Sequence, residues 1–250
     1  MAGIDRICDN QDIVPRAMPS IHDAIISWFS AQKRGTVLDA PAGYGYLGVH
    51  LRDMGYDVTC GEIDTKIFKD KDLRCIYTDL NEKIDSPDGA FDYICCVDGL
   101  EHTTNPYKAV EEFARVLKPG GVGIFSMPNY SNIHRRVKFF LNGYLTLPLS
   151  FEEYLKSGRN LFNFHNSPLT ITIIDLIFKI NGLKVEGILR DTVKWKQYFW
   201  FPLVFLLKLH SWFQSDSKWK RHRYDLTLRN DVILGSSTLI FITRKVPLAC

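Results

Sequence analysis

The sequence predicts an α/β fold in which a mostly parallel β-sheet is covered by helices on both faces. Short apolar segments alternate with segments whose apolar residues recur at helical spacing. A glycine-rich turn follows the first apolar segment, and acidic residues end the next two. This alternation is typical of parallel sheets, because a helix carries the chain back to the start of the next strand.

Four strands are predicted in the first half of the chain. A Pro-Ser start followed by Ile, Ala, Trp and Phe at helical spacing indicates a helix before the first strand. Gly55 ends a second, shorter helix that follows the glycine turn. The predicted strands cover 36–38, 57–61, 74–77 and 91–97, and the predicted helices cover 19–31 and 46–54.

The second half predicts three more strands. Asn105 is suited to cap a helix whose first turn holds Pro106, where the missing N–H has no intrahelical partner. Lys-Pro-Gly-Gly at 118–121 predicts a tight turn into the next strand. The predicted strands cover 122–127, 183–189 and 238–243, with a helix over 170–180. In such sheets, ligands bind outside the carboxyl ends of the strands, where the strand order reverses.

Composition indicates a globular protein with one large domain. The 250 residues include 46% hydrophobic and 24% charged ones, and we expect a single domain over 1–250. The N-terminus lacks a basic region followed by an apolar one, so no secretory signal is evident. The six cysteines form no CxxC pair and have no histidine at zinc spacing. These features favour cysteines as core residues, a cytoplasmic location and no metal site.

Basic charge is concentrated in two segments. The net charge of +3 is too small to indicate a nucleic-acid partner. Residues 129–168 have a net charge of +3 and residues 191–230 of +5, so the remainder has −5. Both segments follow predicted strands, and we expect both to emerge as insertions on the ligand-binding edge and to determine the substrate.

The glycine turn is compatible with two cofactors. Gly43, Gly45 and Gly48 match G-x-G-x-x-G, and Glu62 lies 19 residues after Gly43, as in dinucleotide-binding units. However, Asp39 directly before the turn would repel a pyrophosphate and attract a cationic ligand. The turn alone leaves NAD and S-adenosylmethionine (SAM) open, and its acidic neighbour favours SAM.

The chain resembles the class I SAM-dependent methyltransferases, in particular the branch of quinone-biosynthesis and similar small-molecule enzymes. The segments that carry the resemblance are VLDAPAGYGYLG, VTCGEID, YTDLNE, FDYICCVDGLEH and ARVLKPGG. It covers residues 34–128 strongly, and 165–190 and 236–245 more loosely. It implies a Rossmann-like sheet of seven strands, of which the last is antiparallel.

The resemblance also implies the roles of individual residues. Asp39, Ala40, Gly43 and Gly45 would surround the methionine portion of SAM, and Glu62 would bind the ribose hydroxyls. The remaining implied cofactor contacts are Asp79 and Leu80 beside the adenine, and Asp98 at the end of the fourth strand. Pro41 stands where the motif usually has its first glycine, which changes the path of the turn.

Three histidines are candidates for a general base in methyl transfer to a hydroxyl. His102 ends the fourth-strand motif, His134 is predicted in a loop after the fifth strand, and His165 precedes a helix. Each also has a structural interpretation, as a capping, solvated or helix-entry residue. The sequence does not select one of them.

The segment 195–223 combines aromatic residues, an apolar run and a basic cluster. Its uninterrupted apolar run, 198–207, is ten residues long, against about 20 needed to span a bilayer. This composition favours peripheral contact with the inner face of an anionic membrane, with a lid or a dimer interface as alternatives. The oligomeric state is left open.

The sequence therefore predicts SAM-dependent methylation, preferably of oxygen, on a small or lipid-linked acceptor. Two other functions are compatible with it. The glycine motif with Glu62 would suit an NAD-dependent oxidoreductase or epimerase. Pro41 and the absence of an evident base would suit a non-catalytic, membrane-associated adaptor on the same fold.

Overall fold

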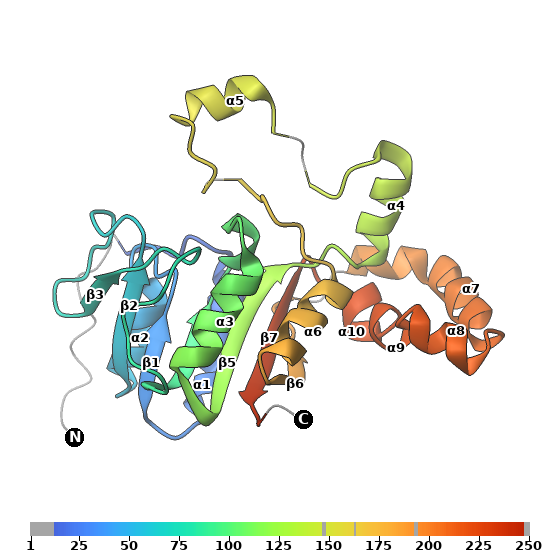
Figure 1. Cartoon of the computed structure of the whole chain (residues 1–250). Coiled ribbons are helices and arrows are strands. Elements are labelled where there is room, and N and C mark those ends of the chain that lie inside the picture. Colours follow the sequence, from blue (N-terminus) through green and yellow to red (C-terminus); the bar gives the residue numbers. More distant parts are fainter. Residues whose placement is uncertain (1–12, 147–148, 163, 193–194, 248–250) are drawn as a thin grey trace.

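A single seven-stranded sheet organises the protein (Figure 1). The computed structural model describes residues 13–146, 149–162, 164–192 and 195–247. The strands lie in the order β3-β2-β1-β4-β5-β7-β6, and β7 is antiparallel to both of its neighbours. The other pairings are parallel. The strands are β1 (Thr36–Asp39), β2 (Asp57–Glu62), β3 (Arg74–Tyr77), β4 (Phe91–Cys96), β5 (Leu117–Pro128), β6 (Leu183–Leu189) and β7 (Thr238–Lys245).

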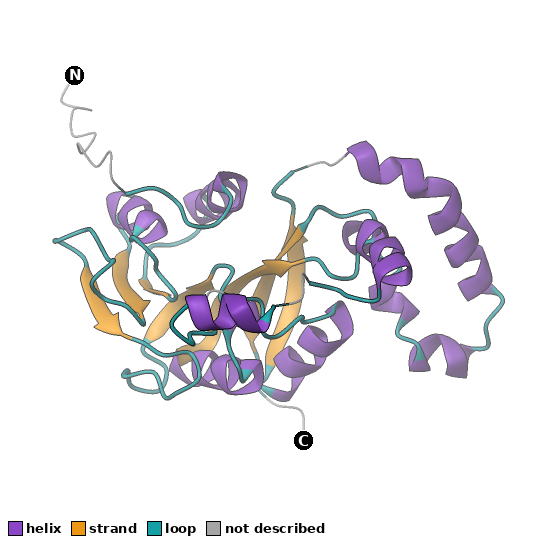
Figure 2. Cartoon of the chain, turned by 90° about the horizontal axis from the view of Figure 1, so that it is seen from above, coloured by secondary structure: helices purple, strands orange, loops and turns teal. Residues whose placement is uncertain are grey.

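The predicted α/β fold is confirmed, with helices on both faces of the sheet (Figure 2). One apolar core contains residues of α1 (Pro19–Ser30) and α2 (Tyr46–Asp53), and the other contains residues of α3 (Pro106–Val116) and α6 (Ile171–Ile180). Consecutive strand residues alternate between the two cores, because side chains of a strand point to opposite faces. In β1, for example, Val37 belongs to the first core and Leu38 to the second.

The order of the strands places a ligand site between β1 and β4. From β1 the chain proceeds to β2 and β3 on one side, and from β4 to β5 on the other. The helices that follow β1 and β4 therefore lie on opposite faces of the sheet, and a crevice opens between the carboxyl ends of these strands. Asp39 is the last residue of β1, and Asp98 follows β4 by two residues.

Several predicted element boundaries need correction. β5 begins at Leu117, not at residue 122, because Leu117 already pairs with Phe91 before an irregularity in the register. Gly120 nevertheless has a φ of +77°, so the predicted turn conformation is present within the assigned strand. β7 extends to Lys245, two residues beyond its predicted end. Cys60, Cys95 and Cys96 are buried and free as predicted, while Cys8 and Cys250 lie outside the described residues.

The two basic insertions contain helices that the sequence analysis did not predict. The first includes α4 (Ile133–Asn142) and α5 (Phe151–Lys156), above the carboxyl edge of the sheet in Figure 1. The second leaves β6 and extends to one side of the sheet. It comprises η2 (Trp195–Trp200), α7 (Phe201–Trp212), α8 (Asp216–Arg221), α9 (Tyr224–Thr227) and α10 (Asn230–Ile233).

Candidate functional site

A pocket of about 580 Å³ lies at the carboxyl edge of the sheet, where the strand order reverses. Its size is within the range of small-molecule and cofactor sites. The ends of β1, β2 and β4 line it, together with the glycine turn and η1 (Leu100–His102). Six carboxylate residues contribute to its lining, namely Asp39, Glu62, Asp64, Asp79, Asp98 and Glu101.

The glycine turn brings the backbone close to the acidic end of β2. Gly43 and Gly45 have φ values of +57° and +93°, a region that side chains with a Cβ rarely adopt. The Gly43 amide donates a hydrogen bond of 2.8 Å to Glu62 Oε2. Pro41, preceded by a cis peptide bond, packs against Gly99, where an added Cβ would lie 2.5 Å from Pro41 Cδ. The turn therefore keeps its two left-handed glycines despite the proline.

Glu62 and Asp39 are buried but differ in their partners. Glu62 also accepts hydrogen bonds from the amides of Ile63 (3.0 Å) and Asp64 (3.4 Å). Asp39 is 1% exposed, and its Oδ2 has no hydrogen-bond partner among the described residues. Burial, with the nearby charge of Glu62, raises the pKa of Asp39 to about 8. Without a cationic ligand, Asp39 is therefore largely protonated at neutral pH.

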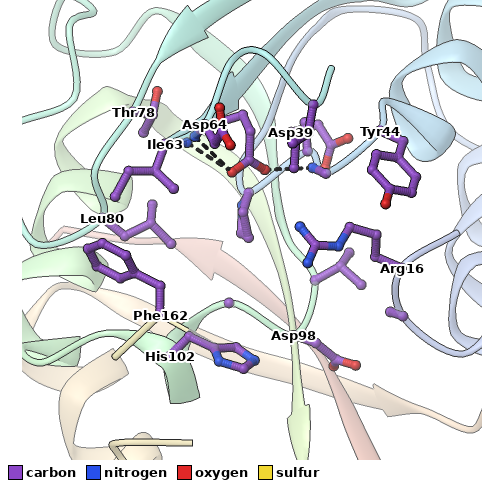
Figure 3. Close-up of a pocket in the computed structure, with 18 of the residues that line it drawn as sticks. Arg16, Asp39, Tyr44, Ile63, Asp64, Thr78, Leu80, Asp98, His102 and Phe162 are labelled. Atoms are coloured by element: carbon purple, nitrogen blue, oxygen red, sulfur yellow. Dashed lines mark hydrogen bonds between the residues drawn. The ribbon is translucent and has the colours of Figure 1, made fainter. Parts of the chain in front are cut away.

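Asp98 lies on the opposite side of the pocket from β2 (Figure 3). Its φ of +45° is unusual for a residue with a side chain. Ser126 stabilises this position, since its hydroxyl donates to Asp98 Oδ1 at 2.5 Å and accepts from the Asp98 amide at 2.9 Å. Burial raises the pKa of Asp98. A strained backbone held by neighbouring groups is common at functional sites.

Of the other predicted cofactor residues, two line the pocket and two do not. Asp79 and Leu80 line the pocket on the side of β3, and Asp79 accepts a hydrogen bond of 2.8 Å from the Asn81 amide. Ala40 and Gly45 do not line it. Ala40 is fully buried in the core, and Gly45 is the N-cap of α2.

The structure brings two of the three candidate histidines together. The rings of His102 and His165 lie edge to face, with 4.9 Å between their centroids, and both line the pocket. Burial lowers the pKa of both rings. His134 is an exposed residue of α4 and does not line the pocket, so its predicted loop position was wrong. The helix begins there because the Asn132 side chain caps it by accepting from the Arg135 amide.

Sequence reasoning missed several residues of the pocket. Arg16 precedes α1, and its guanidinium points into the pocket beside Tyr44 (Figure 3). Asn160 and Phe162 come from the first insertion. No motif in the sequence marks these residues, because they reach the site through tertiary packing. Glu101 is in the segment FDYICCVDGLEH, but its spacing gave no indication of its burial.

The segments that form this pocket lie within the range of a known family model. Residues 9–186 match the model of a methyltransferase domain. The chain belongs to this methyltransferase family. Its sheet and helices are also those of solved methyltransferases, as the resemblance implied.

Curated relatives of this methyltransferase include ubiquinone biosynthesis O-methyltransferases. The protein of Colwellia psychrerythraea is 27% identical over 129 residues, which are 48% of this chain and 49% of that one. The protein of Paracidovorax citrulli is 32% identical over 116 residues, or 42% and 46% of the two chains. The matched region thus spans about half the length of these relatives.

Solved structures share the fold over most of the chain. A putative methyltransferase from Bacillus halodurans has a TM-score of 0.55 at 16% identity, covering 89% of this chain and 98% of that one. A SAM-dependent methyltransferase from Archaeoglobus fulgidus has a TM-score of 0.52 at 12% identity, covering 90% and 94%. At these identities the likeness concerns the fold.

Proposed function

We propose that this chain transfers the methyl group of SAM to a hydroxyl oxygen of a small or lipid-linked acceptor. The observation that carries the proposal is the acidic lining of the pocket at the β1–β4 switch point. Six carboxylate residues line it, against one guanidinium, that of Arg16, among the described residues. The ionised carboxylates of such a site attract a ligand with an ammonium and a sulfonium and repel a pyrophosphate. Buried carboxyl groups such as Asp39, protonated without a ligand, would be stabilised in their ionised form by the same cation.

The same geometry disfavours the NAD alternative. In dinucleotide-binding folds, the amides of the glycine turn and the helix N-terminus face the pyrophosphate. Here the Gly43 amide is bonded to Glu62, and the buried Asp39 carboxyl lies directly before the turn. The unpartnered Asp39 Oδ2 suits an ammonium, which would bind and stabilise its ionised form.

We assign the cofactor contacts from the positions of the lining residues. Asp39 and Asp98 would bind the cationic methionine end, and Arg16 its carboxylate. Glu62, whose carboxylate oxygens retain free lone pairs, would accept the ribose hydroxyls, and Asp79 and Leu80 would flank the adenine. When bound, SAM supplies an activated methyl group on a good neutral leaving group.

The residues around this methyl position would orient the acceptor and exclude water. His165 belongs to the first insertion, and His102 contacts the same segment through the Phe164 carbonyl and the His165 ring. Because burial lowers their pKa, both rings are neutral at pH 7 and able to accept the proton of an acceptor hydroxyl. Phe162 lies next to Leu80 and offers an apolar contact to a ring (Figure 3).

Calorimetry with SAM, S-adenosylhomocysteine and NAD tests the cofactor assignment. We expect binding of the two sulfur compounds and no response to NAD; the reverse result would overturn the proposal. A protein that binds SAM but transfers no radiolabelled methyl to prenylated dihydroxybenzenes would favour the adaptor alternative. These acceptors are chosen because the curated relatives act in ubiquinone biosynthesis.

We further propose that the acceptor is methylated at a membrane surface, through α4, η2 and α7. Helix α7 is apolar on nearly all sides, yet only a narrow stripe is buried, around Val204 and Ser211. Val204 packs with Ile133 of α4 and Ile233 of α10, and α4 also contacts η2. Trp200 and Leu207 are partly buried against this cluster. Many other apolar residues of these helices are exposed: Phe139, Phe140, Leu141, Trp195, Tyr198, Phe199, Phe201, Leu203, Phe205, Leu206 and Trp212.

Basic residues lie beside this apolar surface. Lys218, Lys220 and Arg221 of α8 are exposed, as contact with anionic lipids requires. Arg223 of the predicted basic cluster is instead half-buried and forms a 2.9 Å ion pair with Asp175 of α6. No helix in the described part of the chain has the length and apolarity to cross a bilayer. The exposed apolar and basic residues together support peripheral contact. No described residue of 191–230 lines the pocket.

Vesicle sedimentation tests the membrane proposal with matched variants. Phe199 and Phe213 are 79% and 77% exposed, so their replacement by Ser leaves the packed core intact. We expect the double variant Phe199→Ser/Phe213→Ser to lose most of its binding to vesicles rich in phosphatidylserine. Leu176→Ser, at an exposed apolar residue of α6, is the control and should sediment like the unaltered chain. Equal sedimentation of both variants would contradict the proposal.

A further inference from the structure

Glu101, His102 and His165 form a cluster at the acceptor side of the pocket. Glu101 and His102 belong to η1, directly after β4, and His165 belongs to the segment that leads into α6. Two hydrogen bonds hold these distant segments together. The Ser167 amide donates to the Glu101 carbonyl at 3.0 Å, and the Ser167 hydroxyl donates to the Thr103 carbonyl at 2.8 Å. One ligand atom from each of the three side chains lies within 4.8 Å of the others.

The Glu101 carboxyl has no partner that explains its burial. The residue is 1% exposed, and neither carboxylate oxygen accepts a hydrogen bond from another described residue. Burial, with the charge of Asp98, raises the pKa of Glu101 well above its usual range. A buried, unpartnered carboxylate is costly, and a bound cation is one of the few ways to offset that cost.

Both histidines are oriented by hydrogen bonds at their Nδ1 atoms. His102 Nδ1 lies 3.0 Å from the carbonyl oxygen of Phe164. Because a carbonyl only accepts, Nδ1 carries the proton and Nε2 keeps a free lone pair. His165 Nδ1 lies 2.9 Å from the Tyr130 hydroxyl, which can accept the same kind of bond. Histidines that ligate metals are typically held in this way, with the second ring nitrogen bonded to a carbonyl or another acceptor.

We propose that Glu101, His102 and His165 bind one divalent transition-metal cation whose open positions take hydroxyl oxygens of the acceptor. Two imidazoles and one carboxylate are a ligand set found at catalytic zinc and non-haem iron sites. The inference rests on the proposed function for the identity of the acceptor, but not for the binding of the metal. A metal here would hold the acceptor oxygen in place and lower the pKa of its hydroxyl. With the metal bound, both imidazoles would be ligands instead of bases, and the hydroxyl proton would leave to solvent.

The side chains need only small movements to reach a common cation. Donor atoms about 2.1 Å from one metal lie at most about 4.2 Å apart. A spread of up to 4.8 Å therefore closes with shifts of the order of 1 Å in the side chains. Asp98 also lines the pocket, so a second carboxyl group is available near a cation bound by the cluster. The positive charge of Arg16 lowers the pKa of His102, and that of Arg135 lowers the pKa of His165. Both charges would also repel a cation.

Binding of Co²⁺ to the full, untagged chain after treatment with a chelator tests the proposal. We expect one Co²⁺ per chain with visible ligand-field absorption, and Zn²⁺ to displace it. Glu101→Gln and His165→Asn should each weaken Co²⁺ binding more than tenfold, since loss of even an outer contact costs about 10–100-fold. His50→Asn, at a half-buried histidine outside the pocket, should bind Co²⁺ like the unaltered chain.

SAM calorimetry on the same variants separates this inference from the proposed function. Retained SAM binding by Glu101→Gln with loss of Co²⁺ binding supports the metal site. An unaltered chain that binds SAM but no stoichiometric Co²⁺ would overturn the metal site and leave the methyltransferase proposal standing. If a variant fails to fold, the stoichiometry and spectrum of the unaltered chain alone decide the question.

Absorption spectra with dihydroxybenzenes test whether acceptor hydroxyls bind at the open coordination positions of the metal. A 4-alkylcatechol, whose two hydroxyls are on adjacent ring carbons, should change the Co²⁺ absorption of the unaltered chain. The corresponding 4-alkylresorcinol, whose hydroxyls are at positions 1 and 3, should not. An unchanged spectrum with both compounds would overturn the proposed contact between metal and acceptor.

Discussion

Replacing Asp39 by Asn should stabilise the fold while weakening the binding of SAM. In the folded chain, burial and the charge of Glu62 raise the pKa of Asp39 from 3.8 to about 8. Between these values the folded state holds a proton that the unfolded state releases, so the stability falls as the pH rises from 4 to 8. At pH 7 this amounts to about 4 kcal/mol, taking 1.36 kcal/mol per pH unit. Asparagine does not titrate, so the variant should not lose this stability as the pH rises.

Urea unfolding of both proteins at several pH values measures the effect. We expect the variant to gain almost nothing near pH 4 and about 4 kcal/mol at pH 7, less any change in hydrogen bonding. Asp64→Asn, at an exposed acid close to the same pocket, is the control and should show no such trend. A gain that is equal at pH 4.5 and 7.5, or a net destabilisation at pH 7, would refute the assignment of a buried, protonated Asp39. Calorimetry at pH 7 should show weaker SAM binding, because the variant cannot provide a carboxylate for the ammonium.

Three further substitutions test neighbouring parts of the site and core. Arg16→Ala should weaken binding of S-adenosylhomocysteine at least tenfold, through loss of a charge-assisted hydrogen bond of about 1.5–3 kcal/mol. Binding of 5′-methylthioadenosine should not change, because that compound lacks the carboxylate, and equal losses for both ligands would contradict the role of Arg16. Glu62→Ala should weaken SAM binding by about 1.5–3 kcal/mol in calorimetry, and an unchanged Kd would exclude it as a ribose ligand. Gly48→Ala should lower the free energy of unfolding in urea by about 1–3 kcal/mol, because the new Cβ would lie 2.6 Å from Cys60 Sγ. Its control, Gly187→Ala, places the Cβ in open space and should leave this free energy nearly unchanged.

The sheet could be predicted from the sequence because its signals are local. Short apolar segments, the glycine turn and the Asn105–Pro106 helix start each lie within a few residues of the element they define. The side chain of Asn105 does accept a bond from the Lys108 amide, as its capping role requires. The acidic residues at the strand ends then followed from the rule that parallel strands present their carboxyl ends at one edge.

The acceptor side of the site could not be predicted because it is assembled from distant segments. His165 reaches His102 only because the chain around Ser167 is bonded to η1, more than 60 residues earlier. Nor does spacing reveal that Glu101 is buried, since a Glu next to a His is ordinary at a helix end. The longest helix of the insertions, α7, was missed because it is apolar on nearly all sides, and such a run lacks the periodicity that identifies a surface helix.

The antiparallel strand β7 has a consequence for how the second insertion can vary. The insertion leaves from the end of β6 and returns into β7, and these two strands pair directly, with Leu189 beside Ile240. Its two ends are therefore fixed next to each other by the sheet, and the entropy of closing such a loop depends only weakly on its length. The length and composition of this segment can therefore change without altering the pocket between the ends of β1 and β4.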